Sequence, residues 1–243
     1  MVAEAHRIIE IGLSFLQKIL AFVLSIRIWL SKYRILVTLS GIQQDGMLLL
    51  TLFSYVVKFD TGFAPNPSGD YCTLACCKPN IRKQAGIGDW IVGTGSVNNM
   101  GNAFLIYAME VSESITFAEY FRDTRFQDKI PKNNDDVGDN IYEPLAKGNY
   151  KQLPSRHSHR NGEENLKMKK HDLKSESVLI SSNFSYYGDK AIRIPDEYIN
   201  VIKKGPGFKK KFDEPFLRKI IPWLMGLKKN RIGDPSNSKK TES

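Results

Sequence analysis

Residues 89–111 read DWIVGTGSVNNMGNAFLIYAMEV, and this stretch carries the clearest structural signal in the sequence. Two apolar runs, residues 89–93 and residues 104–111, are rich in β-branched and aromatic side chains and have the length of strands. The segment between them is polar and contains several glycine and asparagine residues, which is typical of a surface loop. We therefore predict two strands joined as a hairpin with a wide connection.

Further short elements are predicted on both sides of this hairpin. Residues 50–58 (LTLFSYVVK) and residues 177–182 (SVLISS) have the composition of strands. Thr116 and Glu119 have the spacing of a capping box at a helix start. Helical patterns cover residues 79–85, 117–122, 197–203 and 214–227, the last with Pro222 as a kink or break.

The mixture of short strands and short helices predicts an α+β fold rather than a doubly wound one. The sequence has no P-loop, and no glycine-rich loop follows a strand with dinucleotide-binding spacing. Residues 129–149 and 153–174 are polar and are predicted to be long loops, and the second holds three of the four histidines.

Positive charge is concentrated in the second half of the chain. The 243 residues have a formal net charge of +9, and residues 131–243 carry 23 Lys and Arg against 15 Asp and Glu. This asymmetry is expected of a surface that faces a polyanion, although a solvated face with a basic tail would look the same. The length is enough for one large domain or two small ones.

An apolar segment, residues 8–30 (IIEIGLSFLQKILAFVLSIRIWL), lies near the N-terminus. Its length matches a bilayer. Glu10, Lys18 and Arg27 interrupt it, and a charge at the centre of a span costs about 3 kcal/mol. The segment lacks the charged start and cleavage site of a signal peptide. Three hypotheses remain: a membrane anchor, an amphipathic helix on a membrane or protein, and an extension without a role that precedes an alternative start at Met47.

The three cysteines, Cys72, Cys76 and Cys77, lie within six positions of one another. An odd and closely spaced set is a poor disulfide framework, which favours a reducing cytoplasm.

One of these thiols is a candidate nucleophile. Lys78 and Arg82 lie close by, near a predicted helix start, and such surroundings favour the reactive thiolate. His157 or His159 would then serve as the general base, if the fold brings either of them close. The alternative is that the small thiols fill a tight core.

A zinc site is the weaker hypothesis for the same residues. Cys72 and Cys76 with the two distant histidines would supply four ligands, but structural zinc sites use tighter paired spacings. No metal site is therefore predicted, and no cofactor is assigned. Acid–base chemistry would need two converging aspartates, whereas turn capping explains each one singly. The aspartates concerned are Asp60, Asp70, Asp89 and Asp139.

Nucleotide binding is predicted for a set of aromatic and basic side chains, because rings stack on bases and cations contact phosphates. The best local patch is residues 209–211, since Gly205 and Gly207 beside it allow close approach of the backbone to a phosphate. Core packing of the rings and solvation of the lysines are the alternative explanations. The predicted residues are Lys78, Arg82, Trp90, Tyr107, Tyr186, Lys209, Lys210 and Lys211.

Several motifs resemble those of a known family. The most specific are FAPNP (residues 63–67), CTLACCKP (72–79) with Ile81-Arg82, and GDWIVG (88–93); IYAM (106–109), GDNIY (138–142), HSH (157–159) and FSYYG (184–188) add to them. Over residues 50 to about 234 the chain resembles the nucleotide modification associated domain 2 family. The resemblance implies a link to systems that modify DNA or nucleotides, and it carries no settled mechanism.

A fainter likeness concerns the fold. GDWIV, the polar loop and the strand that ends in Glu110 and Val111 are similar to the core of PUA-like domains such as EVE and ASCH domains. These are small β-barrels with flanking helices, and many bind RNA or modified bases. The histidine-bearing insertion departs from that pattern. The resulting expectation is an α+β fold with a small mixed or PUA-like β-barrel.

We expect a functional domain over residues 47–234, an N-terminal extension over residues 1–46 and a disordered tail over residues 235–243. Our first hypothesis is a cytoplasmic domain that binds DNA, RNA or a nucleotide, recognises a base and works with base-modifying enzymes. The second is an enzyme that acts on a nucleotide or modified base through a Cys/His site with a nearby Asp. The third is a membrane-tethered interaction module, which rests only on residues 8–30.

Overall fold

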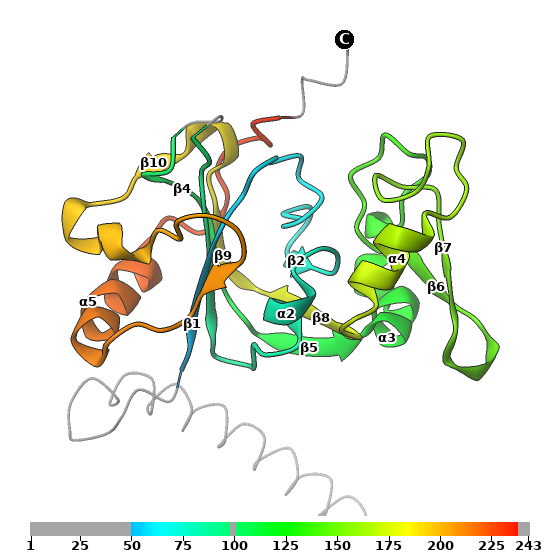
Figure 1. Ribbon diagram of the computed structural model, residues 1–243, viewed down its shortest axis with the longest axis horizontal. Helices are drawn as coiled ribbons and strands as arrows, with labels where there is room; N and C mark the ends of the chain where they lie inside the picture. The colour runs from blue at the N-terminus through cyan, green and yellow to red at the C-terminus, as the bar shows by residue number, and fades with distance from the viewer. Residues whose placement is uncertain (1–49, 98–100, 238–243) are drawn as a thin grey trace, which may run out of the picture. The chain divides into compact units, whose positions relative to one another are not determined.

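The computed structural model describes residues 50–97 and 101–237 (Figure 1). The hypotheses about residues 1–46, including the apolar segment, lie outside the described residues. Within the described ranges, no helix is both long and apolar enough to cross a membrane.

The described residues form short strands, four α-helices and four 3-10 helices. The strands are β1 (Leu52–Val56), β2 (Cys72–Leu74), β3 (Trp90–Thr94), β4 (Phe104–Glu110), β5 (Glu113–Thr116), β6 (Tyr142–Pro144), β7 (Tyr150–Gln152), β8 (Ser177–Ser181), β9 (Asn183–Tyr186), β10 (Ile192–Arg193), β11 (Phe208–Lys209) and β12 (Asn230–Arg231). The helices are α2 (Pro79–Arg82), α3 (Phe117–Arg122), α4 (Leu166–Asp172) and α5 (Glu214–Met225), with η1 (Thr124–Lys129), η2 (Ala146–Gly148), η3 (Gly188–Lys190) and η4 (Asp196–Val201).

The main sheet has the order β11-β1-β3-β4-β9-β12, and β10 also pairs with β4. β3 and β4 are antiparallel, with Trp90 opposite Glu110, so the predicted hairpin is confirmed. β1 runs parallel to β3 with Leu52 opposite Trp90, which makes the sheet mixed.

Two smaller sheets accompany the main one, β2-β8-β5 and β6-β7. The α+β class is therefore confirmed. The strands of the described residues do not close into a barrel, because the main sheet ends at β11 on one side and at β12 on the other. The PUA-like barrel suggested by the fainter likeness is not found.

The main sheet buries both of its faces. Phe53 and Tyr55 of β1 point into one apolar core, and Leu52 points into another. α5 lies on one side of the sheet, while α2 and the three-stranded sheet lie on the other (Figure 1). Ile220 and Leu224 of α5 are fully buried against the second core. α5 runs through Pro222 without a break, which was one of the two alternatives predicted there.

Other helix predictions were right in part. The capping box of α3 is present, with the Thr116 side chain accepting from Glu119 N and the Glu119 carboxylate accepting from Thr116 N. α2 ends at Arg82, sooner than predicted, and the helix near residue 197 is the 3-10 helix η4. The two polar segments contain β6 and α4, and β7 lies between them; the sequence pattern indicated none of these three elements.

The chain stays packed beyond residue 234. The carboxylate of Asp60, which is 1% exposed, accepts hydrogen bonds from the backbone and hydroxyl of Ser236. Asn237 donates its backbone N–H to the Asp60 carbonyl and accepts from the Asp60 N–H. Residues 235–237 thus have defined partners, although the sequence suggested a disordered tail from residue 235.

Candidate active site

Cys77 sits in an unusual backbone conformation between β2 and α2. Its φ is 57° and that of Lys78 is 39°, both in the left-handed region that residues other than glycine rarely adopt. Pro79 then starts α2, and its fixed φ suits the first helical position. Cys77 is partly exposed, whereas Cys72 and Cys76 are buried. Strained backbone of this kind concentrates at functional sites, so Cys77 is the thiol to consider.

His157 lies beside this thiol. Its Nε2 is 3.4 Å from Sγ of Cys77, 80 residues earlier in the chain. The imidazole is nearly buried, and its ring centroid is 4.7 Å from that of Phe63. The side-chain amide of Gln152 donates to the His157 carbonyl. Phe63 therefore packs against the ring, Gln152 holds the backbone of the residue, and one ring nitrogen faces the sulfur.

Asp172, the last residue of α4, completes the group. Its Oδ2 is 2.7 Å from His157 Nδ1 and also accepts from the Tyr142 hydroxyl at 2.9 Å. Its Oδ1 accepts from the backbone N–H of Cys77 at 2.8 Å. Cys77, His157 and Asp172, which we call the triad, thus have the connectivity of nucleophile, base and orienting acid found on many unrelated folds.

His157 and Asp172 each stabilise the charged form of the other. Burial alone would lower the pKa of His157, but the hydrogen bond to Asp172 and the contact with Cys77 outweigh it and raise this pKa to about 10. Burial would raise the pKa of Asp172, yet its bonds to His157 and Tyr142 keep that pKa below the ordinary value. At neutral pH the histidine is therefore an imidazolium paired with a carboxylate, and its other ring nitrogen faces the Cys77 sulfur.

Arg82 has a structural role, although we predicted that it binds nucleotide. It is fully buried, and its guanidinium donates to the carbonyls of Cys77, Ser175, Ser177 and Asp172. One side chain therefore ties the backbone of the thiol to the backbone of the acid. A phosphate cannot reach it in this structure.

The remaining catalytic candidates are less suited to this chemistry than Cys77 and His157. Burial raises the pKa of Cys72 to about 12 and that of Cys76 well above its ordinary value, so neither forms a thiolate near neutral pH. His159 is exposed, and its backbone forms a turn with Glu163.

The predicted aspartates are used in hydrogen bonding, apart from the exposed Asp70. Asp139 is buried and accepts from the Thr73 and Tyr120 hydroxyls. Asp89 caps the turn before β3.

A possible metal-binding group shares His157 and Asp172 with the triad but has Cys76 in place of Cys77, and its geometry does not suit zinc. Ligand atoms of Cys76, His157 and Asp172 lie within 4.8 Å of one another. However, two ligands of one zinc ion, each about 2 Å from the metal at a tetrahedral angle, lie more than ~3 Å apart. The 2.7 Å between His157 Nδ1 and Asp172 Oδ2 fits a shared proton instead.

The aromatic residues predicted to stack on a base are in the core. Trp90 is 2% exposed, and Tyr107 and Tyr186 are not exposed at all. Tyr107 exchanges a hydrogen bond with the Tyr55 hydroxyl. The Lys78 ammonium lies 4.5 Å from the Tyr55 ring centroid, so it covers the core rather than reaching outward. A base cannot stack on these three rings unless the core opens.

The predicted lysines do converge at the surface. Lys209, Lys210 and Lys211 line an open groove of about 800 Å³ together with Lys203 and Lys204. We call this set of five residues the lysine groove.

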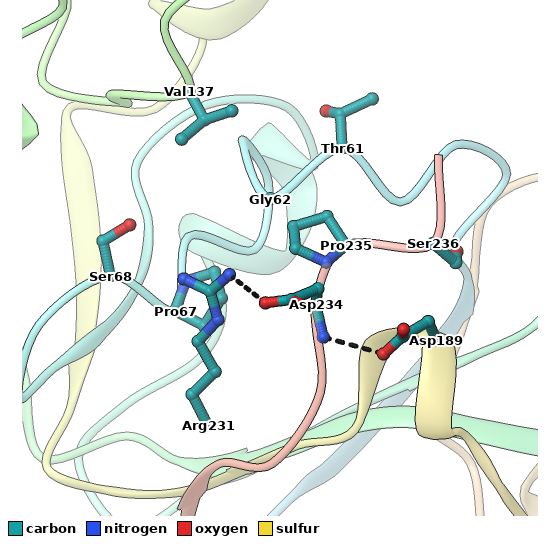
Figure 2. A pocket seen from close by; sticks show the side chains of 10 residues that line it. All are labelled: Thr61, Gly62, Pro67, Ser68, Val137, Asp189, Arg231, Asp234, Pro235 and Ser236. Atoms are coloured by element: carbon teal, nitrogen blue, oxygen red, sulfur yellow. Dashed lines mark hydrogen bonds and ion pairs between the residues drawn. The ribbon is translucent and has the colours of Figure 1, made fainter. Parts of the chain in front are cut away.

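A second hollow, of about 440 Å³, lies between the loop that holds Gly62 and the chain around Asp234 (Figure 2). Its charged groups are bound to one another. Arg231 pairs with Asp234 at 2.7 Å, and Asp189 accepts from the Asp234 N–H. Three polar groups that line this hollow therefore already have partners.

Sequence reasoning missed Asp172, Tyr142 and Gln152. Tyr142 and Asp172 lie in the segments predicted as polar loops, and Gln152 lies between these segments. The one usable signal was Asn165, which caps α4 by accepting from Met168 N and so starts a helix that ends at Asp172.

Comparison with known proteins gives one match. A family model described as nucleotide modification associated domain 2 matches residues 49–242. No curated protein and no solved structure matches the chain.

Proposed function

Because this chain belongs to the nucleotide modification associated domain 2 family, we propose that it is a thiol enzyme of a nucleotide modification system. Its substrate is an acyl group carried by a nucleotide or by a base of DNA or RNA. Cys77 is the nucleophile, His157 the general acid and base, and Asp172 the residue that orients the imidazole. The observation that carries this proposal is the 3.4 Å contact between Cys77 Sγ and His157 Nε2, with Nδ1 of the same ring 2.7 Å from Asp172.

The proposed reaction is hydrolysis of an amide or ester. The Cys77 thiolate forms a bond to the carbonyl carbon, and the π electrons of the carbonyl move to its oxygen. When the carbonyl re-forms, the bond to the amine or alcohol breaks, and the leaving group takes the proton from His157 Nε2. Water then attacks the thioester and gives its proton to the same nitrogen. The carboxylic acid product leaves, and the Cys77 sulfur is again a thiolate.

Base recognition without chemistry was our first hypothesis from the sequence. That hypothesis rested on the family likeness and the C-terminal charge bias, and the three rings named for stacking, Trp90, Tyr107 and Tyr186, are buried. The enzyme hypothesis gains support because the structure joins a partly exposed thiol to a base and an acid from distant parts of the chain. Base-modifying enzymes and a cytoplasmic location stay part of the proposal as the expected setting.

Thiol reactivity tests the proposal first. The native protein is treated with iodoacetamide at about pH 6, where ordinary thiols are almost fully protonated, and the labelled cysteine is located by peptide mass spectrometry. We expect label on Cys77 and its loss in His157→Gln. Cys72 and Cys76 are internal controls, which should react only after denaturation. If Cys77 reacts no faster than the two buried thiols, the nucleophile assignment is wrong.

The acyl chemistry is tested next. A chromogenic acetate ester should leave one acetyl group on Cys77, visible by mass, with a burst of released phenol. Nucleosides that carry an acyl group on the exocyclic amine then form the substrate panel. Absence of any acetyl-enzyme, in a protein whose Cys77 alkylates rapidly, would contradict acyl transfer while keeping the nucleophile.

A further inference from the structure

We propose that the lysine groove binds the sugar–phosphate backbone of a single-stranded nucleic acid, at a site separate from the triad. The proposal goes beyond the thiol chemistry and stands without it. It rests on three observations: five lysines line one groove, none of them forms an ion pair among the described residues, and apolar side chains line the same groove.

Two segments bring the lysines together. η4 leads to Lys203 and Lys204, and the chain then turns through Gly205 and Gly207, whose φ values are 73° and 88°. No atom lies within 4 Å of an added Cβ at either glycine, so the turn is open to solvent. β11 then pairs with β1 at the edge of the main sheet, which fixes Lys209 across the groove from η4.

The positive charge of the groove is not neutralised by the protein. Lys203, Lys209 and Lys210 donate to neutral acceptors, namely the carbonyls of Lys204 and Asn200 and the amide oxygen of Gln84. Among the ion pairs of residues 50–97 and 101–237, none includes a lysine of the groove.

Neighbouring carboxylates are already engaged. Asp213 caps α5 by accepting from Phe216 N, Glu214 pairs with Arg218, and Asp196 pairs with Arg193. No acidic residue is among the described residues that line the groove. Five uncompensated cations around one hollow are the electrostatic requirement for a polyanion.

The floor of the groove favours a single strand over a duplex or a free phosphate. Ile199, Ile202 and Phe208 line it, and Ile199 is 40% exposed. Unpaired bases present flat apolar faces that can rest on such a floor while phosphates contact a basic rim. A duplex keeps its base faces stacked inside, and a free phosphate has no apolar part. Of these three ligands, only an unpaired strand uses both surfaces.

The test measures binding of a fluorescent oligothymidylate of about 20 nucleotides to the full chain by anisotropy. Five contacts predict a slope of log affinity against log salt of about −3.5, so binding should weaken about 10²-fold between ~50 and ~200 mM KCl. Lys204→Gln/Lys211→Gln removes two charges whose side chains have no hydrogen bond or ion pair among the described contacts. It should weaken binding about tenfold and reduce the slope by about 1.4.

Lys167→Gln/Lys170→Gln is the matched control. It removes the same amount of charge from α4, which contributes no residue to the groove. The affinity should therefore stay within about threefold of the parent's. Thermal melts verify that both variants fold. Cys77→Ser should bind as tightly as the parent, so loss of the thiol chemistry does not affect this test.

Three results would overturn the proposal. The first is that the groove variant and the control variant bind equally well. The second is that the duplex of the same length binds as tightly as the single strand. The third is that ATP displaces the oligonucleotide at equal phosphate concentration, which would make the groove a site for free polyphosphates.

Discussion

The backbone N–H of Cys77 donates a 2.8 Å hydrogen bond to Oδ1 of Asp172, 95 residues further along the chain. The other oxygen of the same carboxylate holds His157 at 2.7 Å. One buried acid therefore orients the proposed nucleophile through its backbone and the proposed base through its ring. The contribution of Asp172 can be measured separately from that of the thiol.

Asp172→Asn should weaken the triad without changing its shape. An amide presents no negative charge to Nδ1, so we expect the pKa of His157 to fall from about 10 towards its ordinary value. Turnover of an acyl substrate should fall about 10²–10⁴-fold, as for other orienting acids. NMR titration of the imidazole and the rate of Cys77 alkylation provide the readouts. Asp70→Asn, at an exposed position, is the control, and equal titration curves for the two variants would contradict the role given to Asp172.

The ion pair between His157 and Asp172 should make stability depend on pH. The pKa of His157 is raised on folding, so its contribution is complete below about pH 6.5 and is lost as the pH rises through about 10. The pKa of Asp172 is lowered, so its contribution is complete above its ordinary pKa and is lost in stronger acid. The two shifts share the contact between His157 and Asp172, and the full strength of that contact spans about pH 4 to 6.5.

We expect the alkaline loss to be on the order of 3 kcal/mol. The free energy of unfolding is measured with urea near pH 6.5 and near pH 10.5. The same measurement on His157→Gln gives the contribution of all other groups that titrate in alkali, which is subtracted. A difference between parent and His157→Gln that does not change between the two pH values would show that the pair is not charged.

Arg82→Lys should destabilise the protein although it keeps the charge. Lysine lacks the planar fork that reaches the carbonyls of Cys77, Ser175 and Asp172 at once, so buried acceptors lose their donors. The free energy of unfolding should fall by about 2–4 kcal/mol. Lys83→Ala, at the exposed next residue, should change it by less than about 0.5 kcal/mol. Urea unfolding compares the two variants, and similar values would refute the anchoring role.

Gly93→Ala should disturb the core that contains Tyr107 and Val57. A Cβ at Gly93 would lie 2.3 Å from Cε1 of Tyr107 and 2.7 Å from Cγ2 of Val57, so the ring has to move. We expect a loss of about 1–3 kcal/mol by thermal or urea unfolding. Gly86→Ala is the matched control, because its nearest neighbour is Asp89 Oδ2 at 3.8 Å. An unchanged stability for Gly93→Ala would mean that Tyr107 can shift at little cost.

The hairpin of β3 and β4, the strands β1 and β8, and the capping box of α3 could all be predicted from the sequence. These elements depend on local signals, namely apolar runs of strand length and the spacing of Thr116 and Glu119. The triad could be predicted only in part. Cys77 and His157 stood out by residue type, but Cys72 and Cys76 were equally good candidates, because exposure cannot be read from adjacent positions in a chain.

The sequence by itself determined the α+β class, the family and the concentration of basic residues towards the C-terminus, since composition, periodicity and motifs are local properties. Tertiary structure alone decided which thiol reaches a base, that Asp172 is the acid, and that Trp90, Tyr107 and Tyr186 are core residues. It also decided that Arg82 supports the backbone while the five lysines meet in one groove. The physical reason is that burial and hydrogen bonding depend on contacts between segments tens of residues apart, which the fold creates and no local pattern encodes.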